Sequence, residues 1–573
     1  MTLVCVPIMV RDAESAIAEA SQAKRLGADM VEFRLDGWFA GSDDPDDAHQ
    51  INECVELIGD SPLPCIATCR PAWEGGLYDG AEDQRVSLFQ ALGTSDRPPA
   101  YIDVELQAYT ASANIRQKIN LAVEHPKQRR DVHTRLILSI HDFEGRPPDL
   151  TRRLTQAYSE PAGSVVKVAF RARSLRDNLE LFEILREAQK PTIALGMGEF
   201  GLMSRVLAPK FGGFLTFASL RKEEITAPGQ PTIDELLNLY RFRSIGTDTK
   251  VYGVIGWPVG HSMSPLIHNA GFAEVGHDGV YLPLPIAADA DTRRAGFEDQ
   301  SDHQSEAVDD PAYASFKATV SSLIDDDSLS FAGASVTIPH KINLRRLGLD
   351  EGWIVDLGSN RSGNTLVCAD QSLVTDTDSL AVERLLEERL GQLHRKCVCL
   401  VGTGGVARSI SEELLGSGMD VALVSRDPSR ADELAGSLND DTRSFVVHEI
   451  NGGTGESGSG GTASALLDAL NARADAFINC TPVGMTGGPD PEGLSIPIPE
   501  MTNIGPETVF FDTVYNPIET PMLKAARERG CRTIDGVQMF VKQAAAQFEL
   551  WTGEEAPIEL FDRLVREKLS TAE

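Results

Sequence analysis

The chain has 573 residues, 53 of them Lys or Arg and 85 Asp or Glu, which gives a formal net charge of −32 at pH 7. That charge, without any dense basic run, argues against a nucleic-acid partner, because phosphate backbones need a basic face. Hydrophobic residues make up 42% and charged residues 24%, as in globular proteins, and the length suits three or more domains.

The sequence also excludes several other classes of protein. No apolar run approaches the ~18 residues of a membrane span, and the first residues lack the pattern of a secretory signal. The nine cysteines are scattered and match no zinc motif, so we expect buried free thiols and no metal. We therefore expect a cytoplasmic protein of bacterial type, with a processed plastid protein as the alternative.

The first 240 residues alternate β-prone apolar runs with amphipathic stretches of helix length, which is typical of a parallel sheet with crossover helices. We expect strands at residues 4–8, 30–34, 64–70, 101–104, 136–140, 165–169, 192–195 and 214–217. Eight strands with intervening helices predict an α/β fold, a (β/α)8 TIM barrel over residues 1–240.

The rest of the chain predicts two more domains. A boundary segment at 239–250 leads into an α/β domain over 250–385, which contains an acidic stretch at 287–311 that we interpret as an exposed insertion. From Lys396, CVCLVGTGGVARSISEELLGSG predicts a strand, a glycine turn and a helix, hence a Rossmann domain over 386–535. We expect helices at 536–573 to complete the 250–385 domain, and a flexible loop at 451–462.

Polar residues at the ends of the barrel strands are the first candidates for chemistry. Lys167 lies in the apolar run VVKVAF, where desolvation would favour the neutral amine that attacks a carbonyl. The alternative is a lysine whose charge pairs with a barrel carboxylate. His141 ends the preceding strand and could act as general acid or base beside an imine, with Glu74 holding its tautomer. Arg205 could clamp a carboxylate.

Seven motifs occur in order, EFR, TCR with EGG, DVEL, SIHDF, VVKVA, MGEFGLMSR and TAPGQ, and with them this part resembles the type I 3-dehydroquinate dehydratases. The resemblance implies that Lys167 forms an imine with the C3 ketone of 3-dehydroquinate. It implies that His141 removes the C2 proton and helps to expel the C1 hydroxyl, with Glu74 orienting it. The implied substrate-holding residues are Glu32, Arg34, Arg70, Arg205, Thr226 and Gln230. The family often has Ser in place of Thr226.

The second half carries signs of hydride transfer. The segment GTGGVA at 402–407 joins a predicted strand to a helix, so its backbone amides could receive a pyrophosphate. The next strand ends at Ser425 and Arg426, and Arg430 follows. Two arginines favour the 2′-phosphate of NADP, while the neighbouring Asp427 keeps NAD as an alternative. Lys341 and Asp378 could form an acid–base pair in which the carboxylate orients the amine.

Residues 251–573 resemble the shikimate dehydrogenases through VIGWPVGHSMSPLIHN, GASVTIPHK, SGNTL, TDTD, INCTPVGM and GVQMFVKQAAAQFELWTG. The resemblance implies substrate contacts by Ser262, Ser264, Thr337, Lys341, Asn364, Asp378, Tyr515 and Gln543. It implies cofactor contacts by Gly402, Gly404, Gly405, Ser425, Arg426, Arg430, Thr481, Val514 and Gly536. The chain departs from the family pattern at Ser335, Val374, Asp376 and Ala381.

Together the two resemblances imply a bifunctional enzyme that dehydrates 3-dehydroquinate and reduces the resulting 3-dehydroshikimate to shikimate with NADPH. Its partners would be these small molecules, with no nucleic acid and no membrane. One alternative is a dehydratase fused to an NAD-dependent catabolic quinate or shikimate dehydrogenase. Another is a regulator that senses metabolites without turnover, which the presence of Lys167, His141 and Lys341 disfavours.

Overall fold

The computed structural model describes residues 1–39, 48–124, 133–221, 229–287, 310–357, 362–425, 427–438, 444–448, 474–498, 501 and 504–571. Two predicted site residues, Thr226 and Arg426, lie outside them, as do the predicted loop at 451–462 and most of the acidic stretch. The chain divides into two units. The first comprises Met1–Val251, Asp278–Ile286 and Asp325–Ser330, and the second comprises Tyr252–His277, Ala287–Ile324 and Phe331–Glu573.

The first unit contains an eight-stranded parallel sheet in the order β7-β6-β5-β4-β3-β2-β1-β8. Its strands are β1 (Leu3–Met9), β2 (Met30–Arg34), β3 (Cys65–Thr68), β4 (Tyr101–Glu105), β5 (Arg135–Asp142), β6 (Gly163–Arg171), β7 (Thr192–Met197) and β8 (Leu215–Phe217). Phe214 N donates to Thr192 O at 2.8 Å between the edge strands, so the sheet is nearly closed. The predicted TIM barrel is confirmed.

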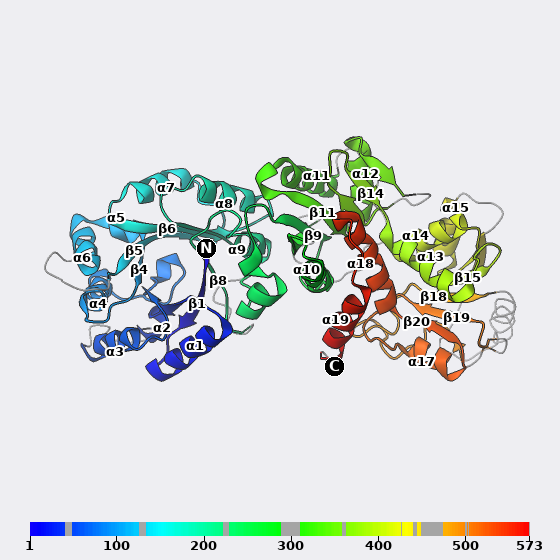
Figure 1. Cartoon of the computed structure of the whole chain (residues 1–573), viewed down its shortest axis with the longest axis horizontal. Coiled ribbons are helices and arrows are strands. Elements are labelled where there is room, and N and C mark those ends of the chain that lie inside the picture. Colours follow the sequence, from blue (N-terminus) through cyan, green and yellow to red (C-terminus); the bar gives the residue numbers. More distant parts are fainter. Residues whose placement is uncertain are drawn as a thin grey trace. The chain divides into compact units, whose positions relative to one another are not determined.

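Helices surround the barrel strands (Figure 1). They are α1 (Ala13–Leu26), α2 (Asp36–Phe39), α3 (Ala48–Gly59), α4 (Glu82–Thr94), α5 (Leu106–Ala111), α6 (Ala113–Val123), α7 (Leu150–Ser159), α8 (Asp177–Arg186) and α9 (Leu202–Val206). Helix α1 shows why they form: Asp12 caps its first turn by accepting from Ser15 N, and Gly27 ends it at φ 98°. Inside the barrel, Cys5, Ile66 and Ile137 belong to a buried apolar cluster.

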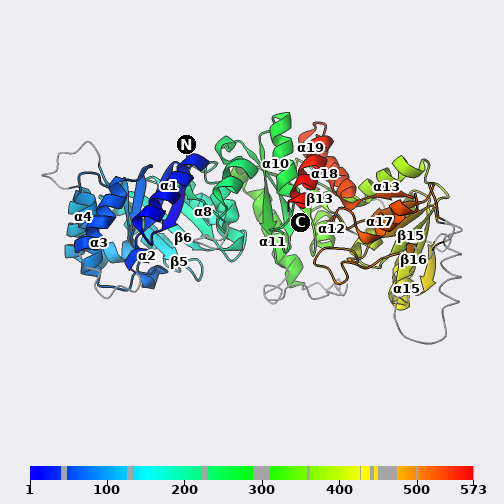
Figure 2. The same ribbon diagram turned by 90° about the horizontal axis from the view of Figure 1, so that it is seen from below.

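A second sheet has the order β10-β9-β11-β13-β14-β12. Its strands are β9 (Lys250–Gly256), β10 (Gly279–Pro285), β11 (Phe331–Val336), β12 (Ile354–Asp356), β13 (Thr365–Val367) and β14 (Leu373–Thr375). Its neighbouring helices are α10 (Ser264–Val275), α11 (Pro311–Asp325), α12 (Lys341–Asp350) and α13 (Thr377–Leu390). The C-terminal helices α18 (Gly536–Thr552) and α19 (Ile558–Ser570) pack against α10 in both views (Figures 1 and 2).

The third sheet is parallel throughout, in the order β17-β16-β15-β18-β19-β20. Its strands are β15 (Cys397–Val401), β16 (Asp420–Ser425), β17 (Ser444–His448), β18 (Ala476–Asn479), β19 (Val509–Asp512) and β20 (Arg532–Ile534), with helices α14 (Gly405–Gly416), α15 (Pro428–Ser437) and α17 (Pro521–Glu528). The strand order reverses between β15 and β18, as in a Rossmann fold, so that prediction is confirmed.

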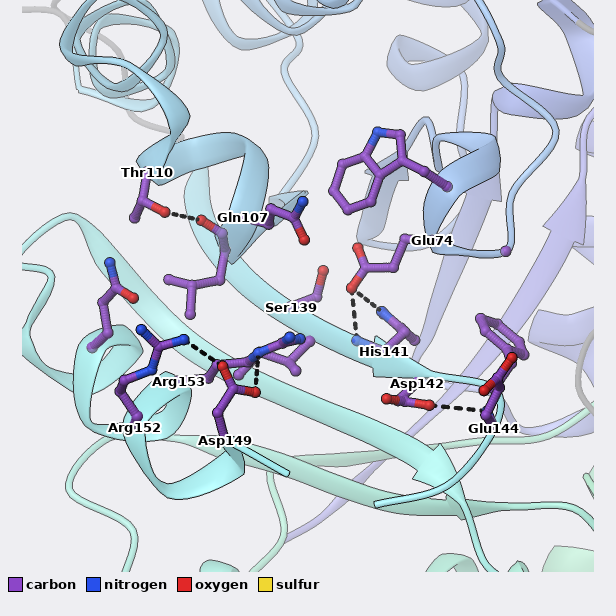
Figure 3. Close-up of a pocket in the computed structure, with 16 residues that line it drawn as sticks. Glu74, Gln107, Thr110, Ser139, His141, Asp142, Glu144, Asp149, Arg152 and Arg153 are labelled. Atoms are coloured by element: carbon purple, nitrogen blue, oxygen red, sulfur yellow. Dashed lines mark hydrogen bonds and ion pairs between the residues drawn. The ribbon is translucent and has the colours of Figure 1, made fainter. Parts of the chain in front are cut away.

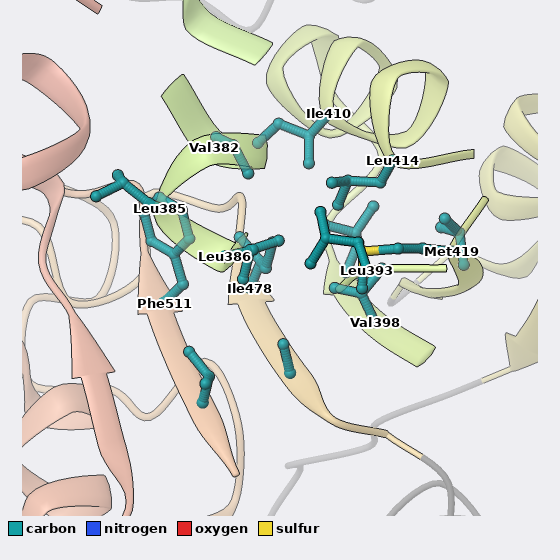
Figure 4. Packing of buried hydrophobic residues seen from close by; sticks show 14 of the residues in the cluster. Val382, Leu385, Leu386, Leu393, Val398, Ile410, Leu414, Met419, Ile478 and Phe511 are labelled. Carbon is teal, nitrogen blue, oxygen red and sulfur yellow. The ribbon is translucent and has the colours of Figure 1, made fainter. Parts of the chain in front are cut away.

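Buried apolar side chains join this sheet to its helices. Leu386 of α13, Leu414 of α14 and Ile478 of β18 are fully buried and belong to one cluster (Figure 4). Because such clusters are packed as densely as crystals, they hold the carboxyl edge of the sheet rigid. None of the described helices combines the length and the apolar character that a membrane crossing requires.

Candidate active sites

A cavity opens where the barrel strands end, and its wall contains every predicted barrel site residue that the structure describes. These are Glu32, Arg34, Arg70, Glu74, His141, Lys167, Arg205 and Gln230. They come from six different strands or the loops after them, so only the closed sheet brings them together. This is the edge at which TIM barrels place their active sites.

Lys167 lies in the middle of β6 and is 4% exposed. Its Nζ lies 2.9 Å from Asp103 Oδ2 and 3.3 Å from Glu32 Oε1, and 4.6 Å from the centre of the Phe217 ring. Without substrate, Lys167 therefore pairs with barrel carboxylates. This is the alternative interpretation that the sequence left open for this lysine. An ammonium cannot attack a carbonyl, so Lys167 has to be in its neutral form when it attacks.

Asp103 is a site residue that the sequence analysis left without a role. It accepts from Lys167, from Arg70 Nη2 at 2.9 Å and from Ser139 Oγ at 2.6 Å. Burial alone would raise the pKa of Asp103, but the charges of Arg70 and Lys167 hold it well below its usual range. The alternation in DVEL was the available signal, because Asp103 and Glu105 must share one face of the strand.

Glu74 holds His141 in place. Its Oε1 accepts from the backbone N–H of His141 at 2.7 Å and lies 3.6 Å from His141 Nδ1 (Figure 3). Burial, with the nearby charges of Arg70 and Lys167, lowers the pKa of His141 well below its usual value, so the ring is neutral at pH 7. Burial also raises the pKa of Glu74 to about 8, although Arg70 opposes it. A neutral imidazole is the form that a general base requires.

A second cavity of about 630 Å³ lies on the other side of this pair (Figure 3). It shares Glu74, Gly75, His141 and Phe143 with the first cavity, so these residues form the wall between the two. On its far side Asp149 pairs with both Arg152 and Arg153 of α7, which neutralises much of their charge. The ring planes of His141 and Phe143 lie within 16° of parallel, with their centres 6.5 Å apart.

Arg205 supplies the positive charge of the first cavity. It lies in α9, is 2% exposed, and its Nε has no hydrogen-bond partner among the described residues. Burial alone lowers the pKa of Arg205 to about 10. No carboxylate of the described residues pairs with this guanidinium, and because a buried guanidinium is costly without such a partner, a bound carboxylate would compensate it.

In the second unit, Lys341 and Asp378 form the predicted pair. Lys341 begins α12 and Asp378 lies in the first turn of α13, and their Nζ and Oδ2 atoms are 2.6 Å apart. Burial alone would lower the pKa of Lys341, but Asp378 and Asp376 outweigh it and leave it above its usual value. The lysine is therefore a charged proton donor at neutral pH.

The positions that depart from the family pattern all have structural partners. Asp376 caps α13 by accepting from Asp378 N at 3.1 Å and from Ser379 Oγ at 3.0 Å. Burial and the Asp378 charge raise the pKa of Asp376 to about 6. Ser335 Oγ donates to Gln547 Oε1 at 2.7 Å, and Val374 and Ala381 are buried apolar residues. The replacements are thus absorbed by capping, hydrogen bonding and packing.

The other predicted substrate residues form local groups. Asn364 Oδ1 accepts from Thr377 N at 2.8 Å, next to Asp378, while Thr337 N donates to Ile255 O at 2.8 Å. Ser262 Oγ accepts from Ser264 N at 3.2 Å. Tyr515 and Gln543 both contact Phe540 of α18. Within the part of the chain that is described, no hydrogen bond joins Lys341 to the two serines, to Tyr515 or to Gln543.

The predicted cofactor residues follow the carboxyl ends of neighbouring strands of the third sheet. Ser425 is the last residue of β16. The other four residues follow strand ends: Gly402 follows β15, Thr481 follows β18, Val514 follows β19 and Gly536 follows β20. Gly402 has φ 113°, and a Cβ there would lie 3.0 Å from Thr481 Cγ2. A Cβ on Gly536 would lie 2.3 Å from Val514 O.

The first turn of α14 is open to a ligand. Gly404 is its N-cap, and a Cβ on Gly404 or on Gly405 would have no atom within 4 Å. Free N–H groups at a helix start attract a pyrophosphate, so these residues fit a dinucleotide. Asp427 caps α15, and its Oδ2 lies 3.8 Å from Arg430 Nε. Among the described residues no group of three His, Cys, Asp or Glu is arranged to hold a metal ion.

The chain is similar to known proteins over both of its units. Family models match residues 4–247 (type I 3-dehydroquinase), 254–348 (shikimate dehydrogenase substrate binding domain) and 536–566 (shikimate 5′-dehydrogenase C-terminal domain). The chloroplastic bifunctional 3-dehydroquinate dehydratase/shikimate dehydrogenase of Arabidopsis thaliana is 33% identical over 98% of this chain and 83% of its own. The shikimate dehydrogenase (NADP(+)) of Moorella thermoacetica is 34% identical over 57% of this chain and 96% of its own. A solved structure of the S. pombe dehydroquinate dehydratase and shikimate dehydrogenase is 21% identical over 98% of both chains, with a TM-score of 0.40.

Proposed function

The chain belongs to the family of bifunctional 3-dehydroquinate dehydratase/shikimate dehydrogenases, and from that premise we propose how its two units perform the two reactions. It is an enzyme of the shikimate pathway, and the barrel makes the 3-dehydroshikimate that the second half reduces to shikimate. The placement of the buried Arg205 in one cavity with Lys167 and His141, with an Arg205 Nε that has no hydrogen-bond partner among the described residues, carries the assignment of the barrel site. We assign the domains to residues 1–240, 250–385 with 536–573, and 386–535.

In the barrel, Arg205 binds the substrate carboxylate, and Lys167 gives up a proton and attacks the C3 ketone. Water leaves and an imine forms, which acidifies the C2 proton. His141 accepts that proton and returns it to the C1 hydroxyl, which departs as water. A second water then hydrolyses the imine and frees the lysine. Glu32, Arg34, Arg70, Thr226 and Gln230 hold the hydroxylated ring, and Glu74 holds the imidazole.

In the second half, NADPH supplies a hydride to the carbonyl carbon when it is bound. Lys341 donates a proton to the carbonyl oxygen, and Asp378 keeps the ammonium charged and oriented. The other residues divide into two sets. Ser262, Ser264, Thr337, Asn364, Tyr515 and Gln543 hold the substrate, whereas Gly402, Gly404, Gly405, Ser425, Arg426, Arg430, Thr481, Val514 and Gly536 hold the dinucleotide. Arg426 and Arg430 favour the 2′-phosphate of NADP.

We expect the enzyme to act on free small molecules in a bacterial-type cytoplasm. A plastid location stays the alternative, since the Arabidopsis relative is named chloroplastic.

The test is an incubation of the purified chain with 3-dehydroquinate, with and without NADPH or NADH. Enone absorbance reports dehydration, and loss of reduced cofactor reports reduction. Lys167→Ala should lower dehydration by about 10³-fold or more, because no other lysine of the described residues lines the cavity. Lys341→Ala should lower only reduction, by about 10²- to 10⁴-fold.

The matched control is Lys118→Ala, which removes an exposed lysine 3.7 Å from Asp83 and should leave both rates unchanged. NADPH should be preferred over NADH. Enone formation by Lys167→Ala at the wild-type rate would refute the imine mechanism, and a preference for NADH would support the catabolic alternative.

A further inference from the structure

Arg85 of α4 is a fully buried arginine that lines neither of the two barrel cavities described above. Its guanidinium pairs with Glu82 at 2.7 Å, donates to Cys69 O at 2.8 Å, and lies 2.6 Å from Glu105 Oε2. Burying a guanidinium costs several kcal/mol unless carboxylates compensate it. The position of Arg85 therefore depends on Glu105, which is itself fully buried.

Glu105 connects Arg85 to the cavity. Its Oε1 accepts from Arg70 Nη1 at 2.7 Å, so one carboxylate lies between two guanidinium groups. Arg70 lines the cavity, and its other nitrogen donates to Asp103, which also holds Lys167. A continuous series of alternating charges thus runs from α4 to the lysine of β6: Arg85, Glu105, Arg70, Asp103 and Lys167.

The register of the strands makes this series compact. Glu105 of β4 is paired with Ser139 of β5, and Ser139 is paired with Lys167 of β6. Ser139 Oγ accepts from Arg70 and donates to Asp103, so it fills the space between the two ion pairs. Removing charge from Glu105 would leave Arg70 held only by Asp103, Ser139 and the more distant Glu74, at 3.5 Å.

We propose that Arg85 is a positioning residue for the dehydration: by holding Glu105 as a carboxylate, it fixes Arg70, and through Arg70 the Asp103 that pairs with Lys167. The inference deepens the proposed function of the barrel and rests on it. Arg85 itself touches neither substrate nor reacting atoms.

The electrostatics support this geometry. Burial raises the pKa of Glu105, while the charges of Arg70 and Arg85 counteract that rise and Asp103 adds to it. Without Arg85 the pKa of Glu105 rises further, so this carboxyl takes up a proton at a higher pH. If dehydration needs the carboxylate, the acid limb of its pH profile must then move to higher pH.

The test compares Arg85→Met, Arg85→Lys and Glu105→Gln in the full chain, with both activities measured on each variant. Arg85→Met and Glu105→Gln should each lower kcat/KM for dehydration by about 10- to 100-fold, with the larger part in KM, since Arg70 is a substrate-binding residue. The kcat/KM of Arg85→Lys for dehydration should lie between those of the wild type and Arg85→Met. An ammonium restores the positive charge but not the paired N–H donors of a planar guanidinium. The acid limb should move to higher pH in Arg85→Met and not in Glu105→Gln.

Two controls separate positioning from general damage. Arg97→Met removes an exposed ion pair with Asp60 and should change nothing. The dehydrogenase rate of every variant reports whether the purified chain is intact. If Arg85→Met does not fold, Glu105→Gln tests the inference in its place, because glutamine keeps the shape of the glutamate side chain. A wild-type kcat/KM for dehydration in Glu105→Gln, or a wild-type kcat/KM and pH profile in Arg85→Met, would overturn the inference. A wild-type chain that makes no enone would overturn the proposed function itself.

Discussion

At the scale of single residues, the barrel site works through charges that the fold removes from water. Burial keeps His141 neutral, leaves Arg205 Nε without a hydrogen-bond partner among the described residues, and raises the pKa of Glu74 to about 8. Glu74 is therefore mostly protonated at neutral pH, even though it lies 3.5 Å from Arg70. It follows that Glu74 orients His141 mainly through the backbone hydrogen bond and not through its charge.

This leads to a prediction for Glu74→Gln. A glutamine resembles the protonated carboxyl and can still accept from His141 N, so dehydration below about pH 7 should change by less than about threefold. Above pH 8 the wild-type carboxyl ionises and the two proteins should diverge. The measurement is kcat and KM for dehydration from about pH 6 to about pH 9.5.

Stability gives an independent check on the same variant. Because the pKa of Glu74 is raised in the folded state, wild-type stability should fall as pH rises from 4.5, the ordinary value, toward about 8. Glutamine does not titrate. The melting temperature of Glu74→Gln relative to that of the wild type should therefore be higher at pH 8 than at pH 5. A large loss of activity at pH 6.5 would show instead that the negative charge is required.

At the scale of elements, the turn between β15 and α14 decides whether a dinucleotide fits. Gly402 adopts φ 113°, and a Cβ at this position would lie 3.1 Å from the backbone oxygen of Cys480. Gly404 has an ordinary φ of −76° and open space around it. One glycine is thus required by the fold, whereas the other keeps the helix start free for a ligand.

Alanine substitutions should separate these two requirements. Gly402→Ala should destabilise the second unit by about 1–3 kcal/mol, because it adds backbone strain and a close contact. Gly404→Ala should leave the melting temperature unchanged and weaken only NADPH binding. Thermal unfolding with and without NADPH measures both effects, and equal melting temperatures for wild type and Gly402→Ala would contradict the structure.

At the scale of the whole molecule, the chain carries two sites that share no residue. The barrel site lies within Met1–Val251, and Lys341 with Asp378 lies within the second unit. The first unit contains the eight-stranded sheet with one buried apolar cluster, and the second contains the sheet of β15 to β20 with another. We propose that the product of the first reaction reaches the second site as a free small molecule.

We therefore predict complementation between two inactive chains. Neither Lys167→Met nor Lys341→Met alone should convert 3-dehydroquinate to shikimate with NADPH, but an equimolar mixture should do so. The first variant should also reduce added 3-dehydroshikimate at the wild-type rate. Failure of the mixture, with each single activity intact, would show that the two sites depend on being in one chain.

Much of the fold and of the candidate sites could be predicted from sequence, because the signals are local. Alternating apolar runs and helical periods placed the eight barrel strands, and the glycine turn placed β15 and α14. Strand ends identified Lys167, His141, Arg70 and Arg205 as cavity residues. The hydrogen bond from Ser335 to Gln547 could not be predicted, because its partner lies 212 residues away.

The sequence by itself thus determined the order of the elements, the fold class and the residue types at each strand end, since period and turn chemistry act over a few residues. Only the tertiary structure decided which charges meet. Lys167 and Asp103 are 64 residues apart, and their pairing depends on the register of three strands and on closure of the barrel. The charge states of Asp103, Glu105 and Arg85 follow from that contact pattern, because inside a protein the energy of a charge depends on the groups packed around it.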